Sequence, residues 1–203
     1  DKTVMRKTLL ANIVETAALN NRYQKRQSLF EIGSIYLKRE DEILPDEPRR
    51  LSILITGVRE ESTWQVKGAE SNYDFYDLKG MVEGLLRGLH INAATYERAT
   101  HTSLHPGRSA MLRVNATPIG AFGELHPLTA ARFDLNVPVM VAEFDLDALL
   151  EYAQSMYPTQ PLPTTPPVLQ DIALIVKAET LAADVERVIV KAGGDMLKGV
   201  RLF

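Results

Sequence analysis

The sequence predicts an α+β protein built on an antiparallel β-sheet with flanking helices. Short apolar runs of strand length follow one another through residues 29–144, and few helical stretches separate them. This order is typical of antiparallel α+β folds rather than of alternating βα units. Five prolines in residues 157–167 then indicate a stiff linker before a strand–helix–strand pattern. The chain therefore predicts one large domain followed by a smaller segment.

The composition limits the kinds of site that the chain can carry. The 203 residues are 45% hydrophobic and 24% charged, which is ordinary for a globular protein. A net charge of -3 gives no overall basic field, so any RNA contact is expected to be local. The lack of cysteine excludes disulfides, thiolate zinc sites and cysteine nucleophiles, and no apolar run suits a membrane span. We expect a cytoplasmic protein, and the chain ends suggest a fragment of a longer one.

The first elements are a helix and two strands. Apolar residues recur at three- and four-residue steps in residues 4–20, which predicts an amphipathic helix. Strands are predicted at residues 29–37 and 51–58, joined antiparallel across the charged segment 38–50. A solvated surface is favoured over an RNA contact for the basic residues around the helix, which are Lys2, Arg6, Lys7, Arg22, Lys25 and Arg26.

The strongest helix prediction follows Asp74, an N-cap candidate, and runs to about residue 89. Its apolar stripe is expected in the core, in particular Phe75, Leu78, Val82 and Leu85. The acidic pairs Asp74/Asp77 and Asp145/Asp147 are interpreted as capping residues rather than as acid–base groups.

A hairpin is predicted at residues 109–125, with Asn115–Pro118 as its four-residue turn. Proline biases the residue before it toward extended conformations, so His105 and His126 are expected at strand or loop ends. Gly120 and Gly123 lie within a strand-like run, where close packing or a bulge is favoured over phosphate binding. The remaining predictions are strands at 94–99, 139–144, 171–176 and 200–203, and helices at 127–133, 147–152 and 181–192, the last capped by Thr180.

Several strings occur in a characteristic order along the chain. They are VMRKTLL, SLFEIGSIYL, DFYDLKGMVEGLL, the pair LHPGRSAML and GAFGELHP, FDLDALL, PVLQDIALIV and VRLF. In this order they resemble the C-terminal portion of the β subunit of bacterial phenylalanyl-tRNA synthetases. The resemblance covers essentially the whole chain.

The resemblance implies a class II synthetase-like noncatalytic core at residues 1–152, a Pro-rich linker at 153–166, and at 167–203 a truncated ferredoxin-like anticodon-binding domain. The core would support a catalytic α subunit in a heterotetramer that uses ATP and Mg²⁺ and binds tRNA. This chain alone is expected to be inactive, with no catalytic, cofactor or metal residue, because the class II arginine and glycine-rich motifs are not found. The family's Arg-Asp pair is Gln-Asp here, and the candidate RNA contacts are Gln170, Asp171, Lys198 and Arg201.

Two alternatives stay open at this point. One is a metal-dependent hydrolase whose ligands are His101, His105, Glu124 and His126. The other is a free-standing class II paralogue that binds an amino acid or an adenylate. Trp64, the single tryptophan, is interpreted as a packing residue or as an interface anchor.

Overall fold

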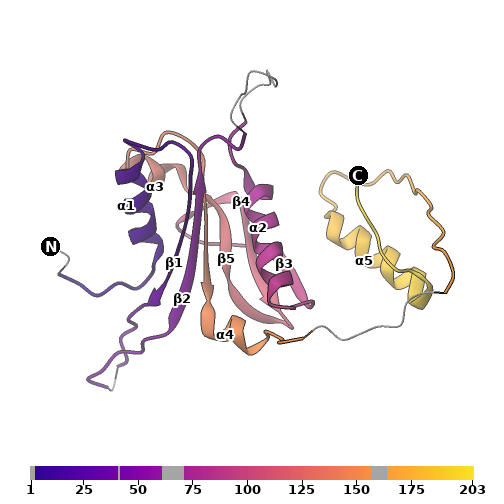
Figure 1. Ribbon diagram of the computed structural model, residues 1–203, viewed down its shortest axis with the longest axis horizontal. Helices are drawn as coiled ribbons and strands as arrows, with labels where there is room; N and C mark the ends of the chain where they lie inside the picture. Colours follow the sequence, from indigo (N-terminus) through magenta and orange to yellow (C-terminus); the bar gives the residue numbers. More distant parts are fainter. Residues whose placement is uncertain (1–2, 41, 61–70, 157–163) are drawn as a thin grey trace. The chain divides into compact units, whose positions relative to one another are not determined.

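The computed structural model describes residues 3–40, 42–60, 71–156 and 164–203. The chain divides into two compact units, Asp1–Pro158 and Thr159–Phe203 (Figure 1). Among these described residues, the first unit contains the sheet and four helices, and the second contains one α-helix and a short 3-10 helix at Gly194–Met196.

Six antiparallel strands form one sheet in the first unit, in the order β1-β2-β6-β5-β4-β3. The antiparallel α+β prediction is therefore confirmed for this unit. The last strand in sequence lies at the centre, between β2 and β5, so the sheet is not a simple meander. The strands are β1 Gln27–Ser34, β2 Arg49–Thr56, β3 Ala94–Arg98, β4 Leu104–Val114, β5 Thr117–Leu125 and β6 Val139–Asp145.

Helices cover both faces of this sheet (Figure 1). Side chains alternate along a strand, and in β6 Met140, Ala142 and Phe144 face one core cluster while Val139 and Val141 face the other. The first cluster packs under α2 (Phe75–Gly88) and α4 (Leu146–Glu151), and the second under α1 (Leu10–Asn20) and α3 (Pro127–Arg132).

Helix α2 begins with a complete capping box. The Asp74 carboxylate accepts from the backbone N–H groups of Tyr76 and Asp77, and Asp77 accepts in return from the backbone N–H of Asp74. This confirms the capping interpretation. Of the four residues expected in the core, Leu78 and Val82 are buried, whereas Phe75 and Leu85 are only partly buried and pack against the core.

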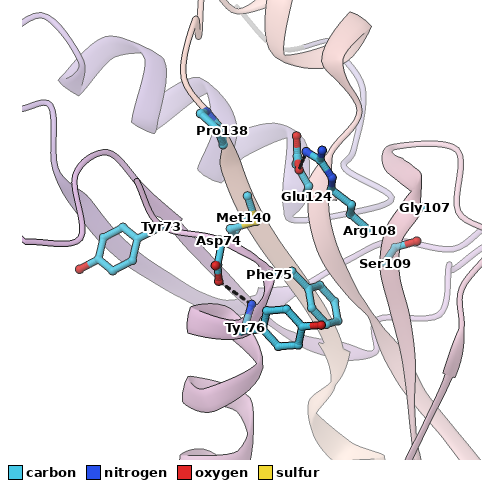
Figure 2. Close-up of a pocket in the computed structure, with 10 residues that line it drawn as sticks. All are labelled: Tyr73, Asp74, Phe75, Tyr76, Gly107, Arg108, Ser109, Glu124, Pro138 and Met140. Carbon is cyan, nitrogen blue, oxygen red and sulfur yellow. Dashed lines mark hydrogen bonds and ion pairs between the residues drawn. The ribbon is translucent and has the colours of Figure 1, made fainter. Parts of the chain in front are cut away.

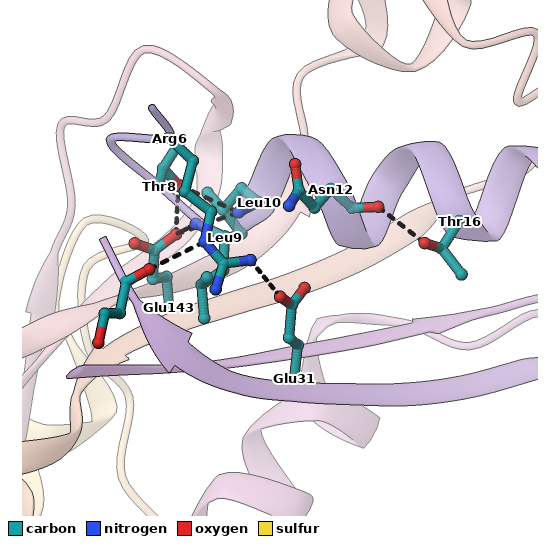
Figure 3. A network of polar contacts seen from close by, with 9 residues as sticks. Arg6, Thr8, Leu9, Leu10, Asn12, Thr16, Glu31 and Glu143 are labelled. Atoms are coloured by element: carbon teal, nitrogen blue, oxygen red, sulfur yellow. Dashed lines mark hydrogen bonds and ion pairs between the residues drawn. The ribbon is translucent and has the colours of Figure 1, made fainter. Parts of the chain in front are cut away.

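Helix α1 begins at Leu10, later than predicted. The preceding segment runs beside the end of β1, where the backbone N–H of Tyr36 donates to the carbonyl of Arg6 at 2.8 Å. The helix start is held by Glu143 of β6, whose carboxylate accepts from the Thr8 hydroxyl and from the backbone N–H groups of Leu9 and Leu10, each at 3.2 Å (Figure 3). A contact 133 residues away in sequence therefore determines where this helix begins.

The β4–β5 hairpin has a tighter turn than predicted. Asn115 and Ala116 alone form it, with φ of 47° and 69°, and Pro118 lies inside β5. Two positive φ values at the turn match the twist of a two-residue hairpin. Gly120 and Gly123 confirm the close-packing interpretation, because a Cβ would lie 2.0 Å from the carbonyl oxygen of Glu143 or 2.3 Å from that of Arg108.

The second unit differs from its predicted strand–helix–strand pattern. The helix is present as α5 (Ala182–Gly193), but its N-cap is Leu181 and no side chain caps it, so the Thr180 cap was wrong. Residues 171–176 and 200–203 are not strands. A strand requires a hydrogen-bonding neighbour, and none of the described residues 164–203 provides a ladder. The ferredoxin-like arrangement stays a prediction.

We expect Leu78→Ala in α2 to lower the free energy of unfolding by about 2–5 kcal/mol, because Leu78 is fully buried between α2 and the sheet. Urea denaturation of the 203-residue chain measures this change. Met81→Ala on the exposed side of the same helix is the matched control and should stay within about 0.5 kcal/mol. Equal losses for both variants would contradict the packing of α2.

We expect Glu143→Ala to destabilise the first unit by about 1–3 kcal/mol, because the Leu9 N–H and the Thr8 hydroxyl lose their acceptor and the Leu10 N–H keeps only its bond to Thr8 Oγ1. Hydrogen exchange of α1 should accelerate more than exchange of α2. Glu97→Ala on the exposed edge strand is the control, since the Glu97 carboxylate pairs with Arg113 at the sheet surface and caps no helix. A Glu143 variant as stable as the control would show that α1 does not depend on this cap.

Candidate functional site

A pocket of about 420 Å³ opens where α2 begins, beside one end of β4, β5 and β6 (Figure 2). The helix contributes its capping residues, and the strands contribute residues from their ends next to the helix start. The lining consists of Tyr73, Asp74, Phe75, Tyr76, Gly107, Arg108, Ser109, Glu124, Pro138 and Met140.

An ion pair forms one side of this pocket. Arg108 Nη1 donates to Glu124 Oε2 at 2.7 Å, across the β4–β5 pair. The Glu124 side chain is 13% exposed, whereas that of Arg108 is 61% exposed. The hydrogen bond to Glu124, together with its negative charge, raises the pKa of Arg108. The carboxylate is thus held in the wall while the guanidinium lies in solvent.

Aromatic rings form the opposite side of the pocket (Figure 2). Phe75 stacks on Phe122 of β5 with ring centroids 5.4 Å apart, and Tyr76 meets Phe75 edge-on at 5.6 Å. Tyr96 packs edge-on against Phe122, and burial raises its pKa to about 12, with a smaller contribution from Glu83. The ring of Phe75 is therefore fixed by the core, while Tyr76 stays largely exposed.

Tyr73 joins the pocket to the segment that follows α1. Its hydroxyl accepts from Arg26 Nε at 3.1 Å and from Arg26 Nη2 at 3.0 Å. The hydroxyl points away from Arg108 and Glu124 (Figure 2). Tyr73 therefore supports the pocket wall without offering its polar end to it.

A second candidate surface is the apolar strip on β1, formed by Phe30 and Ile32. They pair in register with Ile53 and Leu51 of β2, which belong to the core under α2 and α4. The strip itself is uncovered, with Phe30 75% and Ile32 56% exposed. Because β1 is an edge strand, its outer backbone groups have no neighbouring strand among the described residues, although the Ser34 carbonyl accepts from Arg6 Nε.

The predicted metal ligands are not brought together as a metal site. His101, His105 and His126 each accept, through Nδ1, a backbone N–H two residues further on, at 3.0–3.2 Å. Glu124 pairs with Arg108. Within the described part of the chain, no group of three or more His, Asp or Glu side chains is placed to hold a metal ion. The histidines have the local roles predicted for strand and loop ends, and His126 is the N-cap of α3.

The candidate RNA residues lie exposed in the second unit. Gln170 and Asp171 belong to its extended first segment, and Lys198 Nζ donates to the carbonyl of Asp195 at 2.9 Å. Arg201 follows near the chain end. Trp64 lies outside the described residues, as does Lys2.

The basic residues near α1 are partly engaged. Arg6 Nη1 pairs with Glu31 Oε1 at 2.5 Å, and Arg26 with Tyr73. Lys7, Arg22 and Lys25 are exposed, in agreement with the predicted solvated surface.

Sequence reasoning missed the Arg108–Glu124 pair and the apolar strip. Arg108 and Glu124 are 16 residues apart and meet only through the hairpin register. The strip had a signal, because Leu29, Phe30 and Ile32 place apolar side chains on both faces of one strand, as is typical of a strand covered on both sides. None of the described helices is long and apolar enough to cross a membrane.

Comparisons with known proteins identify the family. A model described as the phenylalanyl tRNA synthetase beta chain CLM domain matches residues 1–146. The phenylalanine–tRNA ligase beta subunit of Symbiobacterium thermophilum is 39% identical over 100% of this chain and 23% of its own length. That of Bacillus licheniformis is 37% identical over 100% and 25%. The chain thus spans about a quarter of the length of these relatives.

Solved structures agree on the fold of the sheet. A pyrrolysyl-tRNA synthetase from Desulfitobacterium hafniense aligns with a TM-score of 0.53 and 16% identity, covering 74% of this chain and 53% of its own. A second structure of this synthetase aligns with a TM-score of 0.51. The architecture is therefore that of a class II synthetase, and the chain belongs to the phenylalanyl-tRNA synthetase β-chain family.

Proposed function

We propose that this chain is a noncatalytic scaffold and tRNA-docking part of a phenylalanyl-tRNA synthetase β subunit. It supports a catalytic α subunit, in a cytoplasmic heterotetramer that charges tRNA with phenylalanine. Membership of the β-chain family supports this proposal. The exposed apolar strip on β1 is the observation that carries it.

The strip suits a protein partner. Phe30 and Ile32 continue the core surface of β2 outward, so a partner that covers them extends the apolar layer under α2 and α4. Large exposed apolar side chains beside one another mark interaction sites, and aromatic residues are enriched in the centres of interfaces. Glu31, between Phe30 and Ile32 in sequence, points to the opposite face and pairs there with Arg6. We assign this surface to the α subunit.

Catalysis is assigned to the α subunit. ATP and Mg²⁺ would bind there, because this sequence has no class II motif arginine and no glycine-rich third motif to hold ATP phosphates. The Arg108 guanidinium that lines the pocket is paired with Glu124 rather than free to receive a phosphate. The metal-hydrolase alternative lacks an assembled ligand set among the described residues, and we do not adopt it.

The second unit is proposed as the first half of a ferredoxin-like anticodon-binding domain. Its apolar side chains are exposed in the unit by itself, among them Leu174, Ile175 and Val188. Such a surface is expected where further strands complete a sheet over the helix. Lys198 and Arg201 are the cations that we assign to the tRNA backbone.

Co-purification with the catalytic α subunit tests the scaffold role. We expect a stable complex that supports phenylalanine-dependent pyrophosphate exchange, and no exchange from this chain alone. The double variant Phe30→Ser/Ile32→Ser should weaken the complex by at least about tenfold, because it removes the apolar contact. Leu128→Ser, an exposed apolar residue at α3, is the control and should leave binding unchanged. Exchange by the isolated chain, or equal binding by both variants, would contradict the proposal.

Filter binding of tRNA to the assembled enzyme tests the second unit. We expect Lys198→Ala/Arg201→Ala to weaken binding across a salt series and to flatten its logarithmic slope by about 1–2, as loss of phosphate contacts requires. Lys177→Ala/Lys191→Ala, which also removes two exposed cations of the second unit, is the charge-matched control and should leave the slope as it is. An unchanged slope in the double variant would show that Lys198 and Arg201 do not contact the RNA.

A further inference from the structure

A second pocket lies on the β1–β2 hairpin, beyond the ends of these two strands. It has a volume of about 270 Å³, and its walls come from the hairpin tip and from the segment before α1. This volume is below the range of small-molecule sites, which is about 300–1,000 Å³. The pocket therefore suits a single side chain of a partner protein better than a free ligand. Neither the family match nor the names of the relatives assign a role to it.

The hairpin keeps its strand geometry as far as this pocket. After β1 and β2 end, the two sides of the hairpin continue next to one another (Figure 1), and Leu37 and Asp46 form a further antiparallel bridge in the same register. Side chains alternate between the two faces of such a ladder. Tyr36 of the pocket wall therefore shares a face with Phe30 and Ile32, the residues of the apolar strip. The pocket continues the surface that we assign to the α subunit.

Ion pairs and backbone hydrogen bonds hold the tip of the hairpin in place. Arg39 pairs with Glu42 at 2.7 Å and also with Asp46. Leu37 and Asp46 exchange two backbone hydrogen bonds, at 2.9 and 2.8 Å. A surface that is ordered before binding loses little conformational entropy when the partner arrives. The tip is thus preformed for a contact.

The hairpin tip presents apolar side chains to solvent. Ile43 is fully exposed and Leu44 is 74% exposed, and Met5, which lines the pocket together with Ile43, is 60% exposed. Large apolar residues that are exposed near one another mark interaction sites. Pro45 and the ring of Tyr36 complete the apolar part of the wall. One apolar side chain of a partner can pack against this wall.

The charge of the pocket is positive. Lys7, Lys38 and Arg39 line it with Glu42 as the one carboxylate, which gives a net charge of +2 among the described lining residues. Arg39 is already compensated by Glu42 and Asp46. Lys7 and Lys38 are exposed, and neither has an ion-pair partner in the described part of the chain. Carboxylates of a partner complement these two lysines.

We propose that the contact with the α subunit continues from the apolar strip into this pocket. The α subunit inserts one apolar side chain against Met5, Tyr36 and Ile43, and an acidic residue next to it pairs with Lys7 and Lys38. RNA phosphates would satisfy the lysines but leave the apolar wall uncovered, so the pocket favours a protein. The inference rests on the proposed scaffold role, and it specifies the chemistry of the α-subunit segment that binds at this end.

Protection of a single thiol locates the contact. The sequence has no cysteine, so Ile43→Cys introduces a unique site for maleimide alkylation, which mass spectrometry follows on this chain. We expect saturating α subunit to slow this alkylation at least about tenfold, because the complex covers the pocket rim. Leu128→Cys, at an exposed position of α3, is the matched control and should react equally fast with and without α subunit. Unslowed alkylation of Ile43→Cys in the complex, or protection by tRNA without α subunit, would overturn the proposal.

Charge variants test the acidic nature of the partner segment. We expect Lys7→Ala/Lys38→Ala to weaken the complex about three- to tenfold at low salt and to reduce its salt dependence, because two ion pairs at the rim are lost. Arg22→Ala/Lys25→Ala removes two exposed cations outside the strip and the pocket, and this control should bind as the unaltered chain does. Equal affinity and equal salt dependence in the two variants would overturn the acidic partner.

The outcomes separate this inference from the scaffold role. Urea denaturation reports whether each variant folds, and Leu44→Cys, at an exposed position of the same tip, replaces Ile43→Cys if that variant does not. A complex that Phe30→Ser/Ile32→Ser weakens, but in which the tip thiol stays fully reactive, overturns the pocket contact alone. Failure of the unaltered chain to bind the α subunit overturns both.

Discussion

The burial of β6 on both faces is the constraint on which the first unit depends. The strand is last in sequence but lies between β2 and β5, and five of its seven residues are buried. Its alternating side chains divide the core into one layer under α2 and α4 and another under α1 and α3. The neighbouring strand must approach closely, and Gly120 meets this need because a Cβ there would collide with the carbonyl of Glu143. This strand alone joins the β1–β2 pair to strands β3–β5 in the described sheet.

The same strand also organises the start of the chain. Glu143 lies on the α1 face of β6, and its carboxylate accepts the first backbone N–H groups of α1 (Figure 3). Its negative charge is favourable at the positive end of a helix. Arg6, just before this helix, pairs with Glu31 and donates to the carbonyl of Ser34, so the N-terminal segment is joined to both the central and the edge strand. The position of α1 therefore depends on the place of β6 in the sheet.

The helices leave two surfaces of the first unit accessible. Helices α2 and α4 cover the central strands but not Phe30 and Ile32 on β1, which remain open to a partner. At the start of α2, beside one end of β4 and β5, Glu124, Arg108 and Phe75 line a pocket. The first unit thus leaves an exposed apolar strip and a small pocket beside its sheet.

The local elements were determined by the sequence itself, because caps, turns and apolar periodicity act over a few residues. Asp74 predicted the start of α2, and the antiparallel strands and the β-chain resemblance were read correctly. Features that depend on contacts between residues far apart in sequence were decided only by the tertiary structure. Helix α1 begins at Leu10, where Glu143 accepts its N–H, and not at the earlier residue that periodicity predicted. The register of the β4–β5 hairpin places Arg108 beside Glu124. Strands at 171–176 and 200–203 did not form, because a strand exists only with a hydrogen-bonded neighbour that periodicity cannot supply.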